Sequence, residues 1–237
     1  MLQETMTEKK PLSNRQIMLY FTMGVLCFAF LEFLAQLLWL TKDLNMSLVR
    51  TFAFTGTTLI AISLALSIIF KFFPTTAKYW RYRRYAGVSG FLFIVLHVFG
   101  VLQWYVKWDI NMLYPSRNPF VNPVVFGSMA FPILLIMALT SSDYILSKIG
   151  AKPWKIIHRF VYLAFIATIF HFMLINPLAI NTLPGYLLMF ITAFAVFGEI
   201  FWFFKIAKSK KFKSLGSFIG ILLILLAIIL LYFALKR

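Results

Sequence analysis

The chain contains few charged residues and very few acidic ones. Asp and Glu together number 7 and charged residues make up 13% of the 237 positions, whereas hydrophobic residues make up 62%. A soluble domain is about half apolar and about a quarter charged, so this composition excludes a soluble globular protein. The 23 Lys and Arg side chains give a net charge of +16. They are scattered between apolar segments and form no basic patch with interleaved aromatics, which argues against nucleic acid as a partner.

Cysteine is almost absent as well. Cys27 is the single cysteine and lies inside an apolar stretch, so the chain forms no intramolecular disulfide. There is also no C-x-x-C-H run of the kind that attaches haem covalently. Any cofactor must therefore be held by non-covalent ligands, and histidine is the obvious candidate.

Long apolar runs dominate the chain. A helix needs about 20 apolar residues to cross a bilayer core, and seven stretches qualify: about 17–40, 51–73, 86–107, 123–146, 156–178, 185–206 and 216–235. With only short loops between them, the sequence predicts an all-α integral membrane protein. We expect a bundle of six core transmembrane helices and a seventh, C-terminal helix. The predicted organisation is an N-terminal tail (1–16), a transmembrane domain (17–206) and an additional helix (207–237).

The basic residues are distributed unequally between the two sides of the predicted bundle. Counted over tails and alternate loops, 17 Lys and Arg lie on the side of the N-terminus and 6 on the other side. Cytoplasmic loops carry the excess of basic residues in membrane proteins. The sequence therefore predicts a multi-pass protein of the bacterial inner membrane with its N-terminus in the cytoplasm and, after seven spans, its C-terminus outside.

The chain has only three histidines, His97, His158 and His171, and all lie in or at the edge of predicted spans. A buried imidazole is costly unless its ring nitrogens are satisfied. Haem iron is one such partner. A helix-packing histidine bonded to a neighbouring hydroxyl is the alternative for any one of them, but three together favour a haem site.

Depth in the membrane separates the three histidines. His97 lies about 11 residues into the third span and His171 about 15 residues into the fifth, roughly 17 and 22 Å deep at 1.5 Å per residue. Because both spans run in the same direction, the two rings are predicted to bind one iron from opposite helices. His158 precedes His171 by 13 residues, roughly 20 Å closer to the inner face, where a second cofactor would fit. On a straight helix the rings of His158 and His171 point roughly 140° apart, so they share no face.

Short motifs accompany the histidines along the second to fifth spans. They are Thr55-Gly56, Arg83-Arg84-x-x-Gly87, Ala138-Leu139-Thr140-Ser141 and Trp154-x3-His158-x3-Tyr162-x8-His171. Together they resemble the MsrQ (YedZ) family of haem-b membrane subunits, part of the ferric reductase-like transmembrane superfamily that also includes NADPH oxidases. The resemblance covers roughly residues 17–206, and the motif of the fifth span is its most specific part.

The resemblance implies a function in electron transfer. It places His97, His158 and His171 at the haem-associated positions of the family and implies one haem b, with room for a second. Electrons would come from a cytoplasmic flavin reductase or the quinol pool and pass to a periplasmic molybdopterin-containing methionine sulfoxide reductase. The loops are too short for a flavin or nicotinamide domain, so the chain would be an electron-transfer subunit with FMN or a quinone as a further cofactor.

Two arginines mark a departure from related proteins. NADPH oxidases have a second histidine earlier in the third span, where this chain has Arg83 and Arg84. His158 therefore lacks an evident histidine partner. The arginines are candidates for binding haem propionates or a flavin phosphate through bidentate hydrogen bonds, and positive-inside anchoring explains them equally well.

Other functions remain open at this stage. The same haem residues would serve a ferric reductase or an oxygen-reducing enzyme. A cofactor-free transporter or scaffold would require helices broken in matching halves, but the prolines lie mainly in loops and at span ends, with Pro132 the exception. Glu199, in the sixth span, is expected either to pair with a basic residue or to relay a proton.

Overall fold

The computed structural model describes residues 13–208, which form helices and no strand. The α-helices are α1 (Asn14–Ala35), α2 (Leu44–Phe72), α3 (Trp80–Gly100), α4 (Val124–Leu139), α5 (Asp143–Ile149), α6 (Ala151–Ile157), α7 (Val161–Ile175) and α8 (Leu183–Lys208). Short π-helices continue α1 and α3, at Gln36–Leu40 and Val101–Tyr105. Short 3-10 helices lie at Pro74–Tyr79, Ile110–Leu113, His158–Phe160 and Pro177–Asn181.

The described residues confirm an all-α, multi-pass membrane protein. Five helical stretches are long and apolar enough to cross a bilayer: Asn14–Leu40, Leu44–Phe72, Pro74–Tyr105, Ala151–Ile175 and Leu183–Lys205. A sixth span exists if α4 and α5 are counted together. The predicted seventh span, 216–235, and most of the predicted terminal segments lie outside the described residues.

The fourth span differs in extent from its prediction. The apolar run suggested a helix over 123–146, but α4 ends at Leu139 and α5 turns away from it by 91°. Ser142 has extended backbone, and its hydroxyl caps α5 by accepting from the Ile145 amide. A new helix therefore begins at Asp143, where hydropathy alone would continue the old one.

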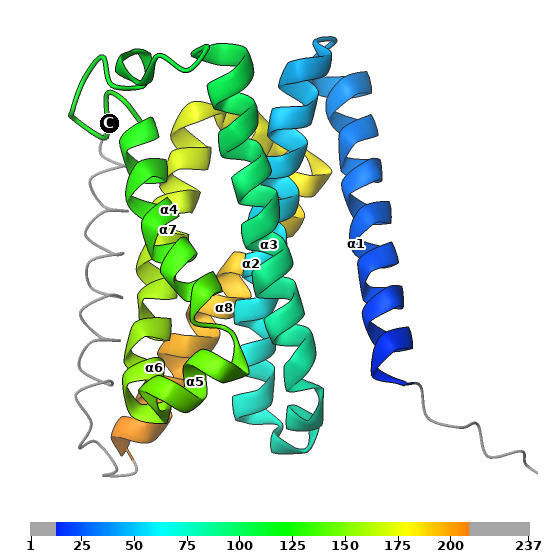
Figure 1. Ribbon diagram of the computed structural model, residues 1–237, viewed down its shortest axis with the longest axis vertical. Coiled ribbons are helices and arrows are strands. Elements are labelled where there is room, and N and C mark those ends of the chain that lie inside the picture. The colour runs from blue at the N-terminus through cyan, green and yellow to red at the C-terminus, as the bar shows by residue number, and fades with distance from the viewer. Residues whose placement is uncertain (1–12, 209–237) are drawn as a thin grey trace, which may run out of the picture.

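Helix α2 lies at the centre of the bundle and packs against α1, α3, α7 and α8. Its contact with α3 depends on two glycines. A Cβ added at Gly56 would lie 2.9 Å from the Gly90 carbonyl oxygen, and one added at Gly90 would lie 2.8 Å from that of Gly56. Small residues of this kind let membrane helices approach closely. Helices α4 and α7 form a second packed pair on one flank of α2 and α3, and α1 lies on the opposite flank (Figure 1).

Large apolar side chains cover the outside of the described bundle. Leu38, Trp39, Phe190 and Phe197 are each about two-thirds or more exposed. In water such a surface would drive aggregation, whereas in a bilayer it contacts lipid tails. The exposed aromatic residues therefore fit membrane lipid as the surrounding medium.

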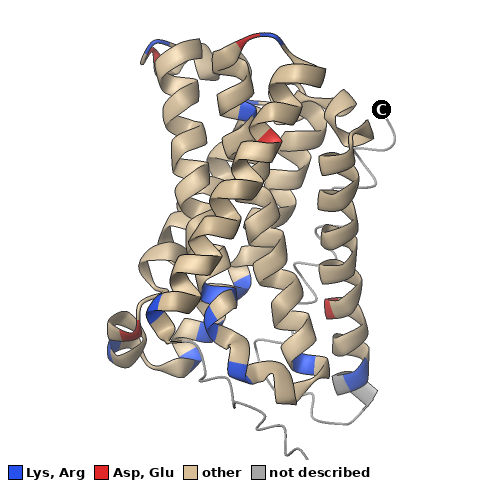
Figure 2. Ribbon diagram, turned by 90° about the vertical axis from the view of Figure 1, so that its right-hand side faces the viewer, with Lys and Arg blue, Asp and Glu red and all other residues tan. Residues whose placement is uncertain are grey.

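Positive charge gathers at one end of the bundle (Figure 2). We call this the basic end: it comprises the start of α1, the turn between α2 and α3, the helices α5 and α6, and the end of α8. Its described cations include Lys78, Arg81, Arg84, Lys155 and Lys205. The opposite end comprises the turn between α1 and α2, the loop between α3 and α4, and the segment between α7 and α8.

Candidate functional site

The structure brings His97 of α3 and His171 of α7 together near the end of the bundle that lies away from the basic end. Their ring centroids are 6.3 Å apart, with the ring planes at 72° to each other. The Nδ1 atom of His97 lies 3.0 Å from the Val49 carbonyl oxygen, and that of His171 lies 2.9 Å from the Pro123 carbonyl oxygen. A carbonyl oxygen only accepts, so in each ring Nδ1 carries the proton and donates it.

This arrangement leaves the second nitrogen of each ring available. Because Nδ1 holds the proton in both His97 and His171, each Nε2 carries a lone pair, and neither Nε2 has a hydrogen-bond partner among the described residues. A neutral imidazole fixed by a hydrogen bond from its other nitrogen is the usual form of a histidine metal ligand. Both rings are therefore in the tautomer that a metal ligand requires, with Nε2 available for binding.

The spacing of the two rings fits axial ligation of a haem iron. A metal–imidazole bond is about 2 Å long, and two such bonds plus the radii of two rings add up to roughly 6 Å, close to the observed 6.3 Å. The described residues contain no cluster of three or more His, Cys, Asp or Glu side chains that would hold a metal ion alone. A two-histidine set therefore suits a metal whose remaining ligands come from a macrocycle.

Backbone and aromatic side chains surround the pair closely. A Cβ added at Gly127 of α4 would lie 3.2 Å from Nδ1 of His171, so only glycine lets α4 pass the ring at this distance. Phe54 packs edge-on against Phe172 at 4.8 Å, and Phe126 stacks on Phe170 at 5.5 Å. These aromatic pairs make the cores of α2, α4 and α7 apolar, which suits a hydrophobic macrocycle.

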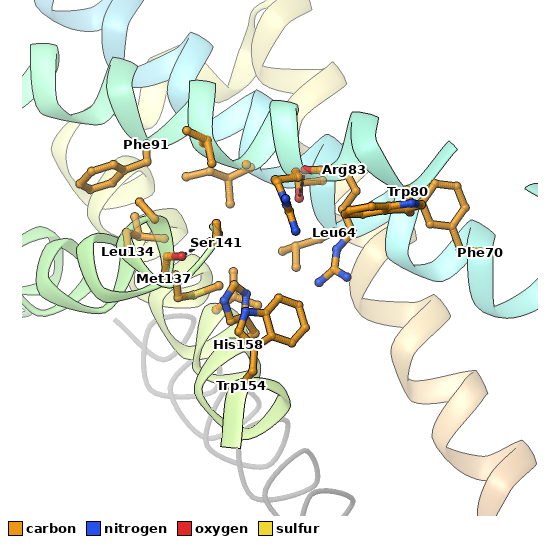
Figure 3. A pocket seen from close by; sticks show the side chains of 17 residues that line it. Leu64, Phe70, Trp80, Arg83, Phe91, Leu134, Met137, Ser141, Trp154 and His158 are labelled. Atoms are coloured by element: carbon orange, nitrogen blue, oxygen red, sulfur yellow. Dashed lines mark hydrogen bonds between the residues drawn. The ribbon is translucent and has the colours of Figure 1, made fainter. Parts of the chain in front are cut away.

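His158 occupies a different place. It lines a cavity of about 130 Å³ near the basic end, together with Trp80, Arg83, Arg84 and Trp154 among others. Arg83 and His158 extend towards this cavity from opposite sides (Figure 3). The predicted separation of His158 from the other two histidines is thus observed: this cavity includes neither His97 nor His171.

The ring of His158 is held by its own neighbours. It stacks on Trp154 at 3.9 Å with 26° between the planes, and its Nε2 lies 3.1 Å from the Thr140 hydroxyl oxygen. That hydroxyl donates to the Ile136 carbonyl, so it accepts from Nε2 of His158. Trp154 Nε1 donates to the Thr140 carbonyl and completes the network. In contrast to His97 and His171, whose Nδ1 atoms donate and whose Nε2 atoms have no partner in the described residues, His158 has its Nε2 engaged with a side-chain hydroxyl.

The two arginines of the Arg-Arg motif have different surroundings. Arg84 donates to Asp143 Oδ1 at 2.6 Å and lies over the Trp80 ring at 4.7 Å, which ties α3 to α5. The hydrogen bond from Arg84 lowers the pKa of the Asp143 carboxyl. Within the described part of the chain the Arg83 guanidinium forms no hydrogen bond or ion pair, while the Arg83 carbonyl accepts from the Ser63 hydroxyl. Arg83 is therefore the arginine available to an anionic group in the cavity.

An ion pair connects α2 and α8 close to this cavity. Lys71 of α2 forms an ion pair with Glu199 of α8, and Tyr162 of α7 lies near the same carboxylate. The expected pairing of Glu199 with a basic residue is confirmed. Arg159 Nη1 is buried without a hydrogen-bond partner, so the cluster carries more positive than negative charge. A low-dielectric environment makes such an excess costly unless an anion approaches.

Sequence reasoning missed the acceptors that orient the two histidines. Val49 and Pro123 act through main-chain carbonyls, and a carbonyl leaves no residue-type signal. Gly127 acts by lacking a side chain. By contrast, Thr140 and Trp154 belong to the motifs already singled out, and their link to His158 explains why these residues occur together.

Similarity to known proteins agrees with this arrangement. Residues 52–169 match the family model described as ferric reductase like transmembrane component, a range that includes His97 and His158 and ends two residues before His171. No solved structure shows significant similarity to the chain.

Curated relatives point in the same direction. The chain is 25% identical over 180 residues to the protein-methionine-sulfoxide reductase heme-binding subunit MsrQ of Caulobacter vibrioides, which covers 73% of this chain and 82% of that protein. It is 32% identical over 94 residues to MsrQ of Azospira oryzae (39% of this chain, 40% of that protein). It is 33% identical over 95 residues to the magnetosome protein MamZ of Magnetospirillum gryphiswaldense (40% of this chain). The matched segment spans only 14% of MamZ and less than half of the Azospira subunit.

The match with the Caulobacter subunit covers 73% of this chain, which is long enough to include all three histidines. The chain belongs to the ferric reductase-like transmembrane proteins, with residues 52–169 as the shared domain.

Proposed function

We propose that the protein is a transmembrane electron-transfer cytochrome b that binds haem through His97 and His171. The observation that carries this proposal is the facing pair of imidazoles, 6.3 Å apart, with both Nδ1 atoms donating to carbonyls and both Nε2 lone pairs available. The names of the MsrQ relatives, which are heme-binding subunits, support the same cofactor. When bound, haem supplies a one-electron carrier inside the membrane.

The pair's position supports delivery of electrons to the opposite end. His97 lies three residues before the end of α3, and its acceptor Val49 lies near the start of α2. Pro123, the acceptor of His171, caps the start of α4. All three of these helix ends lie away from the basic end. With the basic end in the cytoplasm of a bacterium, as the positive-inside rule favours, the haem would lie near the periplasmic face of the inner membrane.

We infer the acceptor from the relatives. MsrQ proteins are named as subunits of a protein-methionine-sulfoxide reductase. A periplasmic molybdopterin-containing reductase subunit is therefore the proposed recipient of the electrons, and a cytoplasmic flavin reductase or quinol the proposed donor.

The surroundings of His158 favour one haem per chain, bound at His97 and His171, and a smaller ligand in the cavity that His158 lines. A second haem bound through Nε2 of His158 would require that nitrogen to leave the Thr140 hydroxyl, while Trp154 stacks on the same ring. The cavity that His158 lines has a volume of about 130 Å³ and includes Trp80, Arg83 and Arg84. A quinol ring or part of a flavin, with Arg83 facing its anionic or carbonyl groups, fits the lining better. We therefore propose one haem per chain and assign His158 to the donor side.

The test is an optical reduced-minus-oxidised spectrum with pyridine haemochrome stoichiometry. The full-length protein is purified in detergent beside His97→Ala, His171→Ala and His158→Ala. We expect a b-type spectrum at one haem per chain that is lost in the first two variants and kept in the third. A colourless wild-type protein after haem supplementation contradicts the proposal, and two haems per chain with loss of one in His158→Ala contradicts the assignment of His158.

A further inference from the structure

Asn122 is a buried polar residue in an otherwise exposed loop at the opposite end. It is 7% exposed, whereas its neighbour Val121 is 62% exposed. Its Nδ2 donates to the carbonyls of Leu113 at 2.7 Å and Ser116 at 3.1 Å, and its Oδ1 accepts from the Val124 amide at 3.3 Å. The side chain thus uses both of its donors and its acceptor on the loop's own backbone.

These three bonds reinforce the point where the loop enters α4, which is also held by main-chain bonds from the Asn122 amide to the Asn118 carbonyl and from the Val125 amide to the Asn122 carbonyl. They join the turn at 113–116 to the first residue of α4, on either side of Pro123. Proline has no amide hydrogen, so its own main chain donates no hydrogen bond that would hold it. The position of its carbonyl is therefore set by its neighbours, and Asn122 supplies the contacts on the loop side.

The Pro123 carbonyl is the acceptor for His171. It lies 2.9 Å from Nδ1 of that ring and also accepts from the Phe126 amide at 3.1 Å. The other histidine has a different support, because the Val49 carbonyl belongs to the interior of the long helix α2 and is held by the helix itself. Of the two acceptors, the one at the start of α4 is thus the one whose position depends on a side chain.

We propose that Asn122 is a positioning residue for the electron carrier: by holding the Pro123 carbonyl against Nδ1 of His171, it sets the electron-donating strength of that ligand. A hydrogen bond from Nδ1 to a well-placed acceptor makes an imidazole a more basic ligand and favours the oxidised metal. Weakening that bond raises the midpoint potential. The proposal rests on the proposed function, since it concerns the haem bound by His97 and His171.

The test compares three variants of the full-length protein in detergent. Asn122→Leu keeps the branched shape with the same number of side-chain heavy atoms and removes all three side-chain bonds. Asn122→Ser keeps one hydroxyl that still reaches the local backbone. Asn118→Ala is the matched control, since Asn118 belongs to the same loop, is exposed, and bonds only the Phe120 amide through its side chain. The readouts are the reduced-to-oxidised haem ratio at fixed ambient potential and the low-spin electron paramagnetic resonance spectrum of the ferric form.

The expected result is a graded change. Asn122→Leu retains haem and shows about a tenfold higher reduced-to-oxidised ratio at fixed potential, which is ~59 mV for one electron, with shifted low-spin g values. Asn122→Ser lies between Asn122→Leu and the wild type, and Asn118→Ala matches the wild type. If Asn122→Leu binds no haem, Asn122→Ser is read by the same criteria.

Two outcomes overturn the proposal. One is an unchanged ratio and unchanged g values in the Asn122 variants. The other is an equal change in Asn118→Ala, which would mean that the loop acts without a specific role for Asn122. Absence of haem from the wild-type protein is a separate result that contradicts the proposed function itself.

Discussion

Replacing Gly127 by alanine tests how closely α4 holds the ring of His171. The added Cβ would lie 3.2 Å from Nδ1 and 3.3 Å from Cε1 of that ring. Ordinary contacts of this kind are a few tenths of an ångström longer, so the ring must move away from α4 and strain its bond to the Pro123 carbonyl. Overpacking of this size costs about 1–3 kcal/mol. Because 1.4 kcal/mol is a factor of ten, we expect haem affinity to fall roughly 5- to 150-fold.

The assay is haem titration of the apoprotein in detergent, followed by absorbance, with Gly24→Ala as the control. Gly24 also lies inside a long helix, but a Cβ there would meet nothing within 4 Å. Alanine has the higher helix propensity by about 1 kcal/mol, so the control should keep its haem affinity and gain slightly in stability. An unchanged haem affinity in Gly127→Ala would refute the idea that this glycine is needed for the ligand geometry of His171.

Three further changes are predicted. Thr140→Val removes the acceptor of His158 and should lower stability by about 1 kcal/mol, measured by thermal unfolding, with the haem per chain unchanged. Glu199→Gln leaves the Lys71 ammonium without its carboxylate in a partly buried cluster and should lower the unfolding midpoint by an amount that corresponds to about 1–3 kcal/mol. Gly56→Ala places a Cβ 2.9 Å from a carbonyl oxygen of α3 and should destabilise the protein by about 1–3 kcal/mol in a denaturant titration.

Each of these predictions has a contradicting result. Loss of haem in Thr140→Val would mean that the network around His158 holds the cofactor. Asp143→Asn is the control for Glu199→Gln, because the exposed ion pair of Asp143 with Arg84 should contribute little to stability. An equally large drop of the unfolding midpoint in Asp143→Asn would show that burial of the Glu199 ion pair does not matter. A stability in Gly56→Ala equal to that of the wild type would show that α2 and α3 adjust to the added methyl group.

Part of the site was predictable because depth in a membrane can be counted from sequence. His97 and His171 lie at similar distances along two parallel spans, and the structure brings them to 6.3 Å. The estimate of 140° between His158 and His171 assumed a straight helix, whereas a 3-10 segment at His158–Phe160 interrupts α6 and α7. His158 nevertheless lies apart from the other two histidines, as predicted, because depth along the span does not depend on that angle.

Other features could not be predicted from residue types. The orientation of both haem-ligand candidates depends on carbonyls of Val49 and Pro123, and any residue supplies a carbonyl. The break after Leu139 is followed by the cap that Ser142 provides for α5, within an apolar run that hydropathy reads as continuous. Close backbone contacts at Gly56 and Gly127 become meaningful only when the neighbouring helix is known.

Ligation by His97 and His171 is tested by low-temperature electron paramagnetic resonance of the oxidised, detergent-purified protein beside His171→Ala. We expect a low-spin ferric signal typical of two axial imidazoles in the wild type. In the variant this signal should be replaced by a high-spin signal or lost together with the haem. A high-spin signal in the wild type, or a low-spin signal that persists unchanged in His171→Ala, would contradict ligation by His97 and His171.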